Sequence, residues 1–364
     1  MARRLGRAVG VLVLAILVAF PVWSYLSTET VSAPRTIVGL MAAVAAVSPA
    51  SALLLCAGVL PLTGPLSASL GTATLFTLGE PLVVAFLAGW LLRVAVWPGP
   101  PTEARIRMVR RPALVLAVVV AASGVVRLSA VQPTVAYPWP FAGMVFRFLY
   151  TDFFRNRATF GAIADAAFFL EGLGLFVAGV TLVGQNRALG HRLLTMVTCG
   201  AAGVAALNIG QLLMASLSTG DVWDALVRSI HTIRITAAFP DLNAAGSYLA
   251  MDLLLSVGLA FAALGHDETG GRAGAGHRLG LLWLPVVPVL AIGLWLTGSR
   301  TALVAVVPAA FALLPVVFRA PRWAAWGAIG AAVLAVALSL PLAGGRFSVS
   351  TETRRPVRVA VNYR

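Results

Sequence analysis

The chain has 364 residues, of which 59% are hydrophobic and only 11% are charged, and its mean hydropathy is +0.91. A soluble domain of this size carries about a quarter charged residues, so the composition excludes an ordinary soluble protein. The formal net charge is +14 and all 27 basic residues are arginine. These arginines stand between hydrophobic blocks, where membrane topology accounts for them, which argues against nucleic acid as a partner.

Apolar blocks of about 18–25 residues recur along the chain, the length that a helix needs to cross a ~30 Å hydrocarbon core. The sequence therefore predicts an all-α fold, a polytopic transmembrane bundle. The predicted spans are about 8–26, 36–62, 75–93, 112–130, 161–183, 193–217, 244–264, 279–298, 302–318 and 323–343. The block 36–62 is too long for one ordinary helix, and Ser48-Pro49 predicts a break into two short helices. The total is about 10–11 spans, depending on whether both short helices cross.

The distribution of arginine predicts the topology. Arg3, Arg4 and Arg7 precede the first span, which we interpret as a retained insertion signal, and the positive-inside rule places them in the cytoplasm. A second basic cluster at 105–111 also lies inside only if the block 36–62 crosses twice. We therefore expect a multi-pass protein of the cytoplasmic membrane whose N-terminus is cytoplasmic.

This topology directs several arginine-bearing segments outward. They are the loops 131–160 and 218–243, the turn 298–301 and the tail 344–364, and together they hold eleven arginines. An anionic ligand at the outer face would explain that excess, and a loosely held tail would explain only its last members. The predicted organisation is one transmembrane domain over 1–343, followed by an external tail over 344–364.

The two cysteines, Cys56 and Cys199, fall in separate apolar spans. They form no C-x-x-C pair and no zinc-ligand spacing, so the sequence predicts no metal site. Both are expected to be small buried hydrophobic residues.

A polar cluster precedes the predicted span 244–264. Arg228, His231, Arg234, Asp241 and Asn243 lie within sixteen residues of an otherwise apolar chain. Asp241 or Asn243 suits the start of a helix, where a side chain caps exposed N–H groups, and such an end attracts anions. A solvated loop with an ordinary cap is the alternative.

A second motif, Thr297-Gly298-Ser299-Arg300-Thr301, separates two apolar runs. Burying an arginine at membrane depth costs about 2.5–3.5 kcal/mol on insertion scales, so Arg300 is expected to have a role. The alternative is that its guanidinium extends to the interface while its stem stays in the apolar region.

The two motifs in this order resemble the O-antigen ligase/polymerase superfamily. Arg234 is followed by Phe239–Gly246, which reads FPDLNAAG, and then by a span, a cytoplasmic loop and a span that ends in Thr297–Ala302, which reads TGSRTA. The segment Gly79-Glu80-Pro81 is compatible with the family but less specific. The resemblance covers most of the chain and depends on two short motifs.

The resemblance implies transfer of a glycan from a polyprenyl-diphosphate carrier to a hydroxyl of a sugar or lipid acceptor, at the outer face of the membrane. It implies an inverting reaction without metal or cofactor, in which membrane lipids surround the donor. Arg234 and Arg300 match the family's phosphate-contacting arginines, and arginine at low dielectric stabilises the charge on a diphosphate leaving group. Asp241, Asn243, Ser299 and Arg228 are the expected substrate-binding residues.

The family carries its general base, a histidine, in a later external loop. No histidine follows His277 in this sequence, so we expect a chain truncated at its C-terminal end, with its tail as the start of that loop. His231 is a substitute candidate for the base. Binding of the lipid donor is therefore better supported than turnover.

Two other functions stay open. A transporter or flippase for an anionic solute or lipid would need a midplane site, for which the mid-span acids Asp165, Glu171 and Asp252 are the available groups. A non-catalytic subunit that assembles other envelope enzymes is the third.

Overall fold

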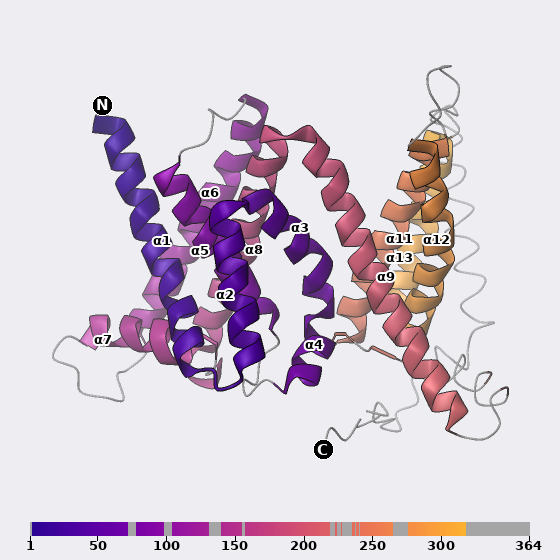
Figure 1. The fold of residues 1–364 in the computed structure, drawn as a ribbon, viewed down its shortest axis with the longest axis horizontal. Coiled ribbons are helices and arrows are strands. Elements are labelled where there is room, and N and C mark those ends of the chain that lie inside the picture. The colour runs from indigo at the N-terminus through magenta and orange to yellow at the C-terminus, as the bar shows by residue number, and fades with distance from the viewer. Residues whose placement is uncertain are drawn as a thin grey trace. The chain divides into compact units, whose positions relative to one another are not determined.

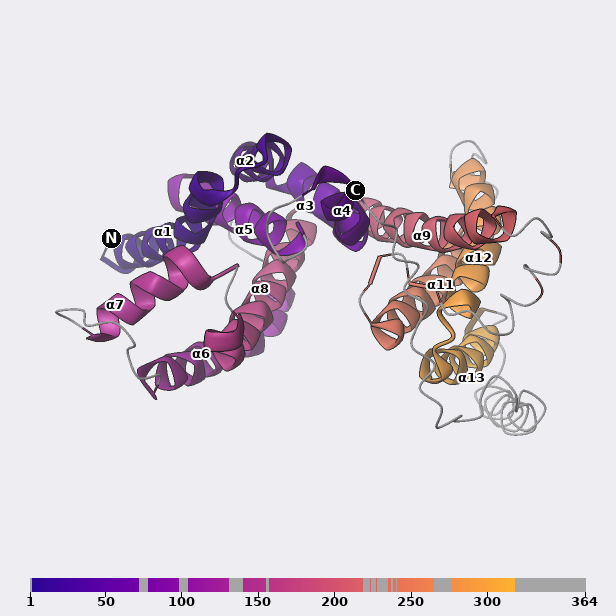
Figure 2. The same cartoon turned by 90° about the horizontal axis from the view of Figure 1, so that it is seen from below.

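The computed structural model describes residues 2–71, 78–97, 104–130, 140–154, 157–218, 223, 227, 235–236, 238–239, 241–264 and 276–317. All regular elements in these ranges are helical, which confirms the predicted all-α class for the described part of the chain. The chain divides into two compact units, Met1–Met196 and Val197–Arg364, and each is considered by itself (Figures 1 and 2).

The first unit contains most of the helices. They are α1 (Ala2–Thr28), α2 (Ser32–Val47), α3 (Pro49–Val59), the 3-10 turn η1 (Leu60–Leu62), α4 (Thr63–Leu70), α5 (Gly79–Val96), α6 (Ala104–Ala130), α7 (Pro140–Arg147), the π-helical turn η2 (Phe148–Asp152), α8 (Arg157–Gln185) and the beginning of α9 (Arg187–Leu217). The second unit contains the rest of α9, α11 (Leu242–Leu264), α12 (Gly276–Thr297) and α13 (Arg300–Val317).

Seven helices among the described residues are long and apolar enough to cross a membrane. They indicate a multi-pass membrane protein. The count of 10–11 spans, the side of the N-terminus and the single domain over 1–343 stay predictions. The predicted span 323–343 and the tail 344–364 lie outside the described residues.

The predicted break at Pro49 is present. α2 ends at Val47 and α3 begins at Pro49, where proline has no N–H to donate and suits the first turn of a helix. α3, η1 and α4 then continue as one apolar stretch, Pro49–Leu70, which is long enough to span, whereas Ser32–Val47 is a shorter apolar helix.

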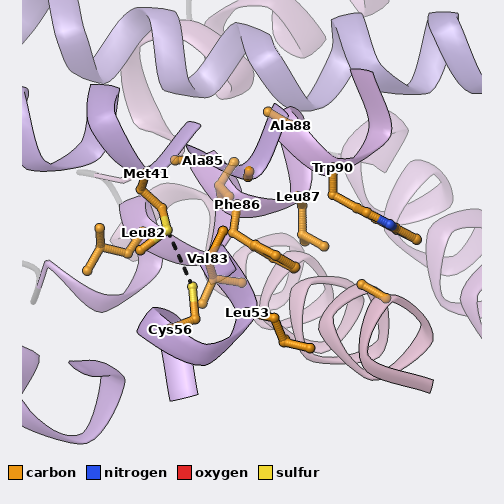
Figure 3. Packing of buried hydrophobic residues seen from close by; sticks show 14 of the residues in the cluster. Met41, Leu53, Cys56, Leu82, Val83, Ala85, Phe86, Leu87, Ala88 and Trp90 are labelled. Carbon is orange, nitrogen blue, oxygen red and sulfur yellow. Dashed lines mark hydrogen bonds between the residues drawn. The ribbon is translucent and has the colours of Figure 1, made fainter. Parts of the chain in front are cut away.

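α5 is the central helix of the first unit. It packs against α1, α2, α3 and α8, and the run from Gly79 to Leu91 is buried apart from Glu80. Figure 3 shows Leu82, Val83 and Phe86 of α5 facing Met41 of α2 and Leu53 and Cys56 of α3. The Cys56 Sγ lies 3.8 Å from the Met41 Sδ, which confirms that Cys56 is a small buried core residue.

Gly89 sets how closely α5 approaches α2. A Cβ at this position would overlap the carbonyl oxygen of Ala42 and the Cβ of Ala45. Small residues at such crossings let helix backbones come together, a common basis of packing in membrane proteins. The alanines of α2 and this glycine therefore make one close helix contact.

The prediction of an outer loop over 131–160 missed a helical element. α7 and η2 occupy part of that segment. η2 packs against α1, and the Phe146 ring of α7 lies 5.7 Å from the Phe20 ring of α1. Residues 157–160 of the predicted loop belong to α8, and 131–139 and 155–156 lie outside the described part.

In the second unit, α11 packs against both α12 and α13. A Cβ on Gly293 of α12 would overlap the Cβ of Ala205 of α9, so these two helices are also in close contact. Cys199 of α9 is exposed, and the prediction that it is buried was wrong. The cause is that lipid-facing and protein-facing positions of a membrane helix are both apolar.

Candidate functional site

The structure describes part of the predicted site. Asp241, Asn243 and Ser299 are described with their side chains, and Arg300 is the first residue of α13. Arg228, His231 and Arg234 lie outside the described residues, so their predicted roles stay predictions.

Asp241 is the N-cap of α11. Its Oδ1 accepts a hydrogen bond from the Asn243 N–H at 3.2 Å, and its Oδ2 accepts one from the Ala244 N–H at 3.1 Å. Its carbonyl oxygen accepts the first helical bond, from the Ala245 N–H at 3.1 Å. The predicted capping role is therefore present, and the carboxylate is already engaged by two backbone amides.

Ser299 is the corresponding cap of α13. Its carbonyl oxygen accepts from the Leu303 N–H at 3.2 Å, and its Oγ accepts from the Ala302 N–H at 3.4 Å. The Ser299 N–H donates to Thr297 Oγ1 at 3.2 Å. The amides of Arg300 and Thr301 belong to the first turn, where helix geometry supplies no acceptor four residues back.

A side-chain hydrogen bond joins the two motifs. Ser299 Oγ donates to Asn243 Oδ1 at 3.2 Å, across 56 positions of sequence. Ser299 is 2% exposed, whereas Asn243 is exposed. The starts of α11 and α13 therefore lie together, with a buried hydroxyl beneath an accessible amide.

Gly246 makes this approach possible. An added Cβ there would lie 2.8 Å from Ser299 Oγ and 3.0 Å from Ala302 Cβ. The small residues in both motifs thus serve a packing purpose, because they bring two helix N-termini side by side. Each N-terminus carries roughly half a positive elementary charge. The Asp241 carboxylate already occupies the start of α11, so the start of α13 is the end that favours an anion.

A two-residue link supplies the geometry between α12 and α13. Gly298 has a φ of 64°, a left-handed conformation that glycine adopts without steric cost. Its N–H donates to the Trp295 carbonyl at 3.1 Å, and Thr297 Oγ1 donates to the Leu294 carbonyl at 2.7 Å. The link positions Arg300 immediately after the turn.

The segment that precedes α11 is attached at two points. The Ile235 N–H donates to the Leu296 carbonyl oxygen at 2.9 Å, and the side chains of both residues are buried together with Leu212. Four residues later, the Phe239 ring lies 5.4 Å from the Tyr248 ring. Ile235, the residue directly after Arg234, is therefore held against Leu296 near the end of α12. Leu296 lies four residues before Arg300.

Tyr248 and Asp252 form a polar pair inside α11. The sequence pointed to Asp252 alone and not to its pairing with Tyr248. Asp252 is 3% exposed and its carboxyl interacts with the Tyr248 hydroxyl, which also donates to the Val197 carbonyl oxygen at 3.3 Å. Their spacing of four residues could have predicted the pair, because residues four apart lie on one face of a helix. Asp165, another acid considered for a midplane site, is exposed.

Comparison with known protein families, with curated proteins and with solved structures gives no match for this chain.

Proposed function

We propose that this protein transfers a glycan from a polyprenyl-diphosphate carrier to a hydroxyl of a sugar or lipid acceptor at the outer face of the cytoplasmic membrane. The observation that carries the proposal is the Ser299–Asn243 hydrogen bond of 3.2 Å. It joins the two motifs on which the resemblance to the O-antigen ligase/polymerase superfamily depends.

The chemistry of the donor explains why such a junction is useful. The bond between the anomeric carbon and the phosphate oxygen breaks, and its electron pair remains on the diphosphate. The acceptor oxygen bonds to the carbon from the opposite side and gives its proton to a base, for which His231 is the candidate in this sequence. The step therefore builds negative charge where the donor diphosphate is bound.

Two features support stabilisation of that charge here. The N-terminus of α13 lies beside α11, and Arg300 opens α13. Arg234 immediately precedes Ile235, whose N–H is bonded to Leu296. In this proposal both guanidinium groups contact the diphosphate and stabilise the negative charge that develops on it.

Binding of undecaprenyl diphosphate, the expected carrier product, tests the proposal most directly. The full chain in detergent micelles is titrated with this lipid and with undecaprenol, and the complexes are counted by native mass spectrometry. We expect the diphosphate to bind and the alcohol to bind weakly. Arg234→Ala and Arg300→Ala should each lower the affinity about ten- to a hundredfold, because each removes a charged hydrogen bond worth about 1.5–3 kcal/mol.

Arg187→Ala is the matched control, since Arg187 is an exposed arginine at the start of α9. It should bind like the wild type. Wild-type affinity in both site variants would contradict the proposal. Turnover is then followed with undecaprenyl-diphosphate-linked oligosaccharide and an acceptor glycan. Both arginine variants should make no product, although the variant proteins should be as abundant in the membrane as the wild type.

A transporter of an anionic solute or lipid is the second candidate, and the buried Asp252 beside Tyr248 favours it. An ionisable side chain within a membrane helix is costly and commonly marks a solute or proton pathway. Uptake into proteoliposomes that depends on the chain and on Asp252, without extension of any glycan, would support transport over transfer.

A further inference from the structure

We propose that α7 and η2 form an interfacial element that lies in the headgroup region of the bilayer, with the lipid surface itself as its partner. The proposal is independent of the proposed glycan transfer, because it depends only on the first unit.

The composition of the segment is unusual for this chain. Six of the fifteen residues from 140 to 154 are aromatic, whereas aromatic residues make up 9% of the whole sequence. They are Phe141, Phe146, Phe148, Tyr150, Phe153 and Phe154. Aromatic side chains concentrate at membrane–water interfaces, and α7 ends in a basic residue, Arg147.

The element is too short to cross a bilayer. α7 has 8 residues and η2 has 5, whereas a spanning helix needs about 20. It lies in sequence between two helices of spanning length, whose apolar parts are Met108–Arg127 and Ile163–Gln185. A short helix in that position lies along the membrane surface or is surrounded by water.

Contacts with α1 fix its depth. The rings of Phe146 and Tyr150 each lie 5.7 Å from the Phe20 ring, and the Phe154 ring lies 5.7 Å from the Tyr25 ring. Ser24 Oγ also donates to the Tyr150 carbonyl oxygen. All three α1 residues belong to the second half of the apolar stretch Val9–Thr28, and Ser24 and Tyr25 lie within its last five residues. The element therefore lies between the bilayer centre and the level where α1 leaves the hydrocarbon core. Figure 1 shows α7 running across the end of α1.

The two faces of the element differ. Phe148 is 7% exposed and packs with Ile163 of α8 and with Phe153. Phe146 is 52% exposed although it stacks on Tyr150, and Trp23, on the same part of α1, is 64% exposed. Exposed aromatic rings on both elements continue the apolar outer surface of α1, which includes Ile16 and Leu17. An aromatic face of this kind, next to an arginine, is typical of helices that bury one side in the headgroup boundary.

Site-directed spin labelling measures this depth. The full chain with Cys56→Ala and Cys199→Ala receives a single cysteine at Phe146, is labelled with a nitroxide and is reconstituted in phosphatidylcholine/phosphatidylglycerol vesicles. Val118, 68% exposed near the middle of the stretch Met108–Arg127, supplies the reference for the bilayer centre, and a free water-soluble nitroxide supplies the reference for water.

We expect the ratio of collisions with oxygen to collisions with a water-soluble nickel chelate to be several-fold higher at position 146 than for the free nitroxide, and lower than at position 118. A water-like ratio would overturn the proposal and show that the element stands in the aqueous phase. Protection from both reagents would also overturn it, since it would show that a protein partner or a second copy covers this face.

Discussion

Close glycine contacts bring helices together in both units, but among the described residues only in the second is such a contact accompanied by a polar junction between two helix starts. In the first, α5 is surrounded by apolar side chains and Gly89 brings its backbone against α2. In the second, the Ser299–Asn243 hydrogen bond joins the starts of α11 and α13, and Asp241 caps α11. The first arrangement stabilises a scaffold, whereas the second keeps polar groups fixed and partly accessible, as a binding site requires. Substitutions of comparable size should therefore have different consequences in the two units.

The largest effect is expected from Gly89→Leu. The side chain would have to occupy the space of the Ala42 carbonyl and the Ala45 side chain, so α5 and α2 would separate. Overpacking of this kind costs about 1–3 kcal/mol and more where backbone blocks relaxation. We expect a strong loss of monodisperse protein and of apparent melting temperature in detergent. Gly172→Leu in α8 is the control, because nothing lies within 4 Å of its Cβ position, and an equal loss there would refute the packing explanation.

Gly246→Ala should have a smaller effect on stability but a direct effect on the site. The new methyl group would push Ser299 and Ala302 away from α11, and we expect a loss of about 2 kcal/mol together with weaker binding of undecaprenyl diphosphate. In the same helix, Gly258 has nothing within 4 Å of its Cβ position. Gly258→Ala should therefore leave binding unchanged and should gain up to about 1 kcal/mol from helix propensity. Unaltered binding in Gly246→Ala would show that the contact between α11 and α13 does not form the site.

The polar junction itself can be measured by a double-mutant cycle. Ser299→Ala, Asn243→Ala and the double variant are compared by thermal unfolding in detergent, and we expect a coupling energy of about 1 kcal/mol, the net value of one hydrogen bond. Additive effects of the two substitutions would mean that the 3.2 Å contact contributes nothing.

The smallest effect is expected from Tyr248→Phe. It removes the hydroxyl that reaches Val197 and Asp252 but keeps the ring contact with Phe239. Polar contacts between membrane helices average about 0.6 kcal/mol, so a small decrease in melting temperature should result. Tyr150→Phe in the first unit is the comparison, because its ring contacts with Phe20 and Phe146 would remain. An equal decrease in both variants would show that the hydroxyl of Tyr248 has no particular role.

The sequence predicted what depends on local chemistry. The break at Pro49, the cap at Asp241 and the turn before Arg300 follow from short patterns, and the structure contains all three. The exposure of Cys199 was not predicted, because hydropathy separates membrane from water but does not separate a lipid-facing position from a buried one. The helical α7–η2 segment was not predicted because elements of 8 and 5 residues are too short to be recognised as a span. The bond between Asn243 and Ser299 could be anticipated only through the resemblance, since nothing local connects residues 56 positions apart.

The two-residue link between α12 and α13 also constrains how the chain is made. Only Gly298 and Ser299 separate the two helices, and the predicted topology has both of them cross the membrane. In that topology a link of two residues is too short for α12 to insert while α13 remains outside the bilayer. We expect them to leave the translocation machinery as one hairpin whose tip carries Arg300 through the membrane. Apolar surface on both helices must then offset the cost of moving that charge, so a nascent chain that ends within α13 should fail to insert α12 as well.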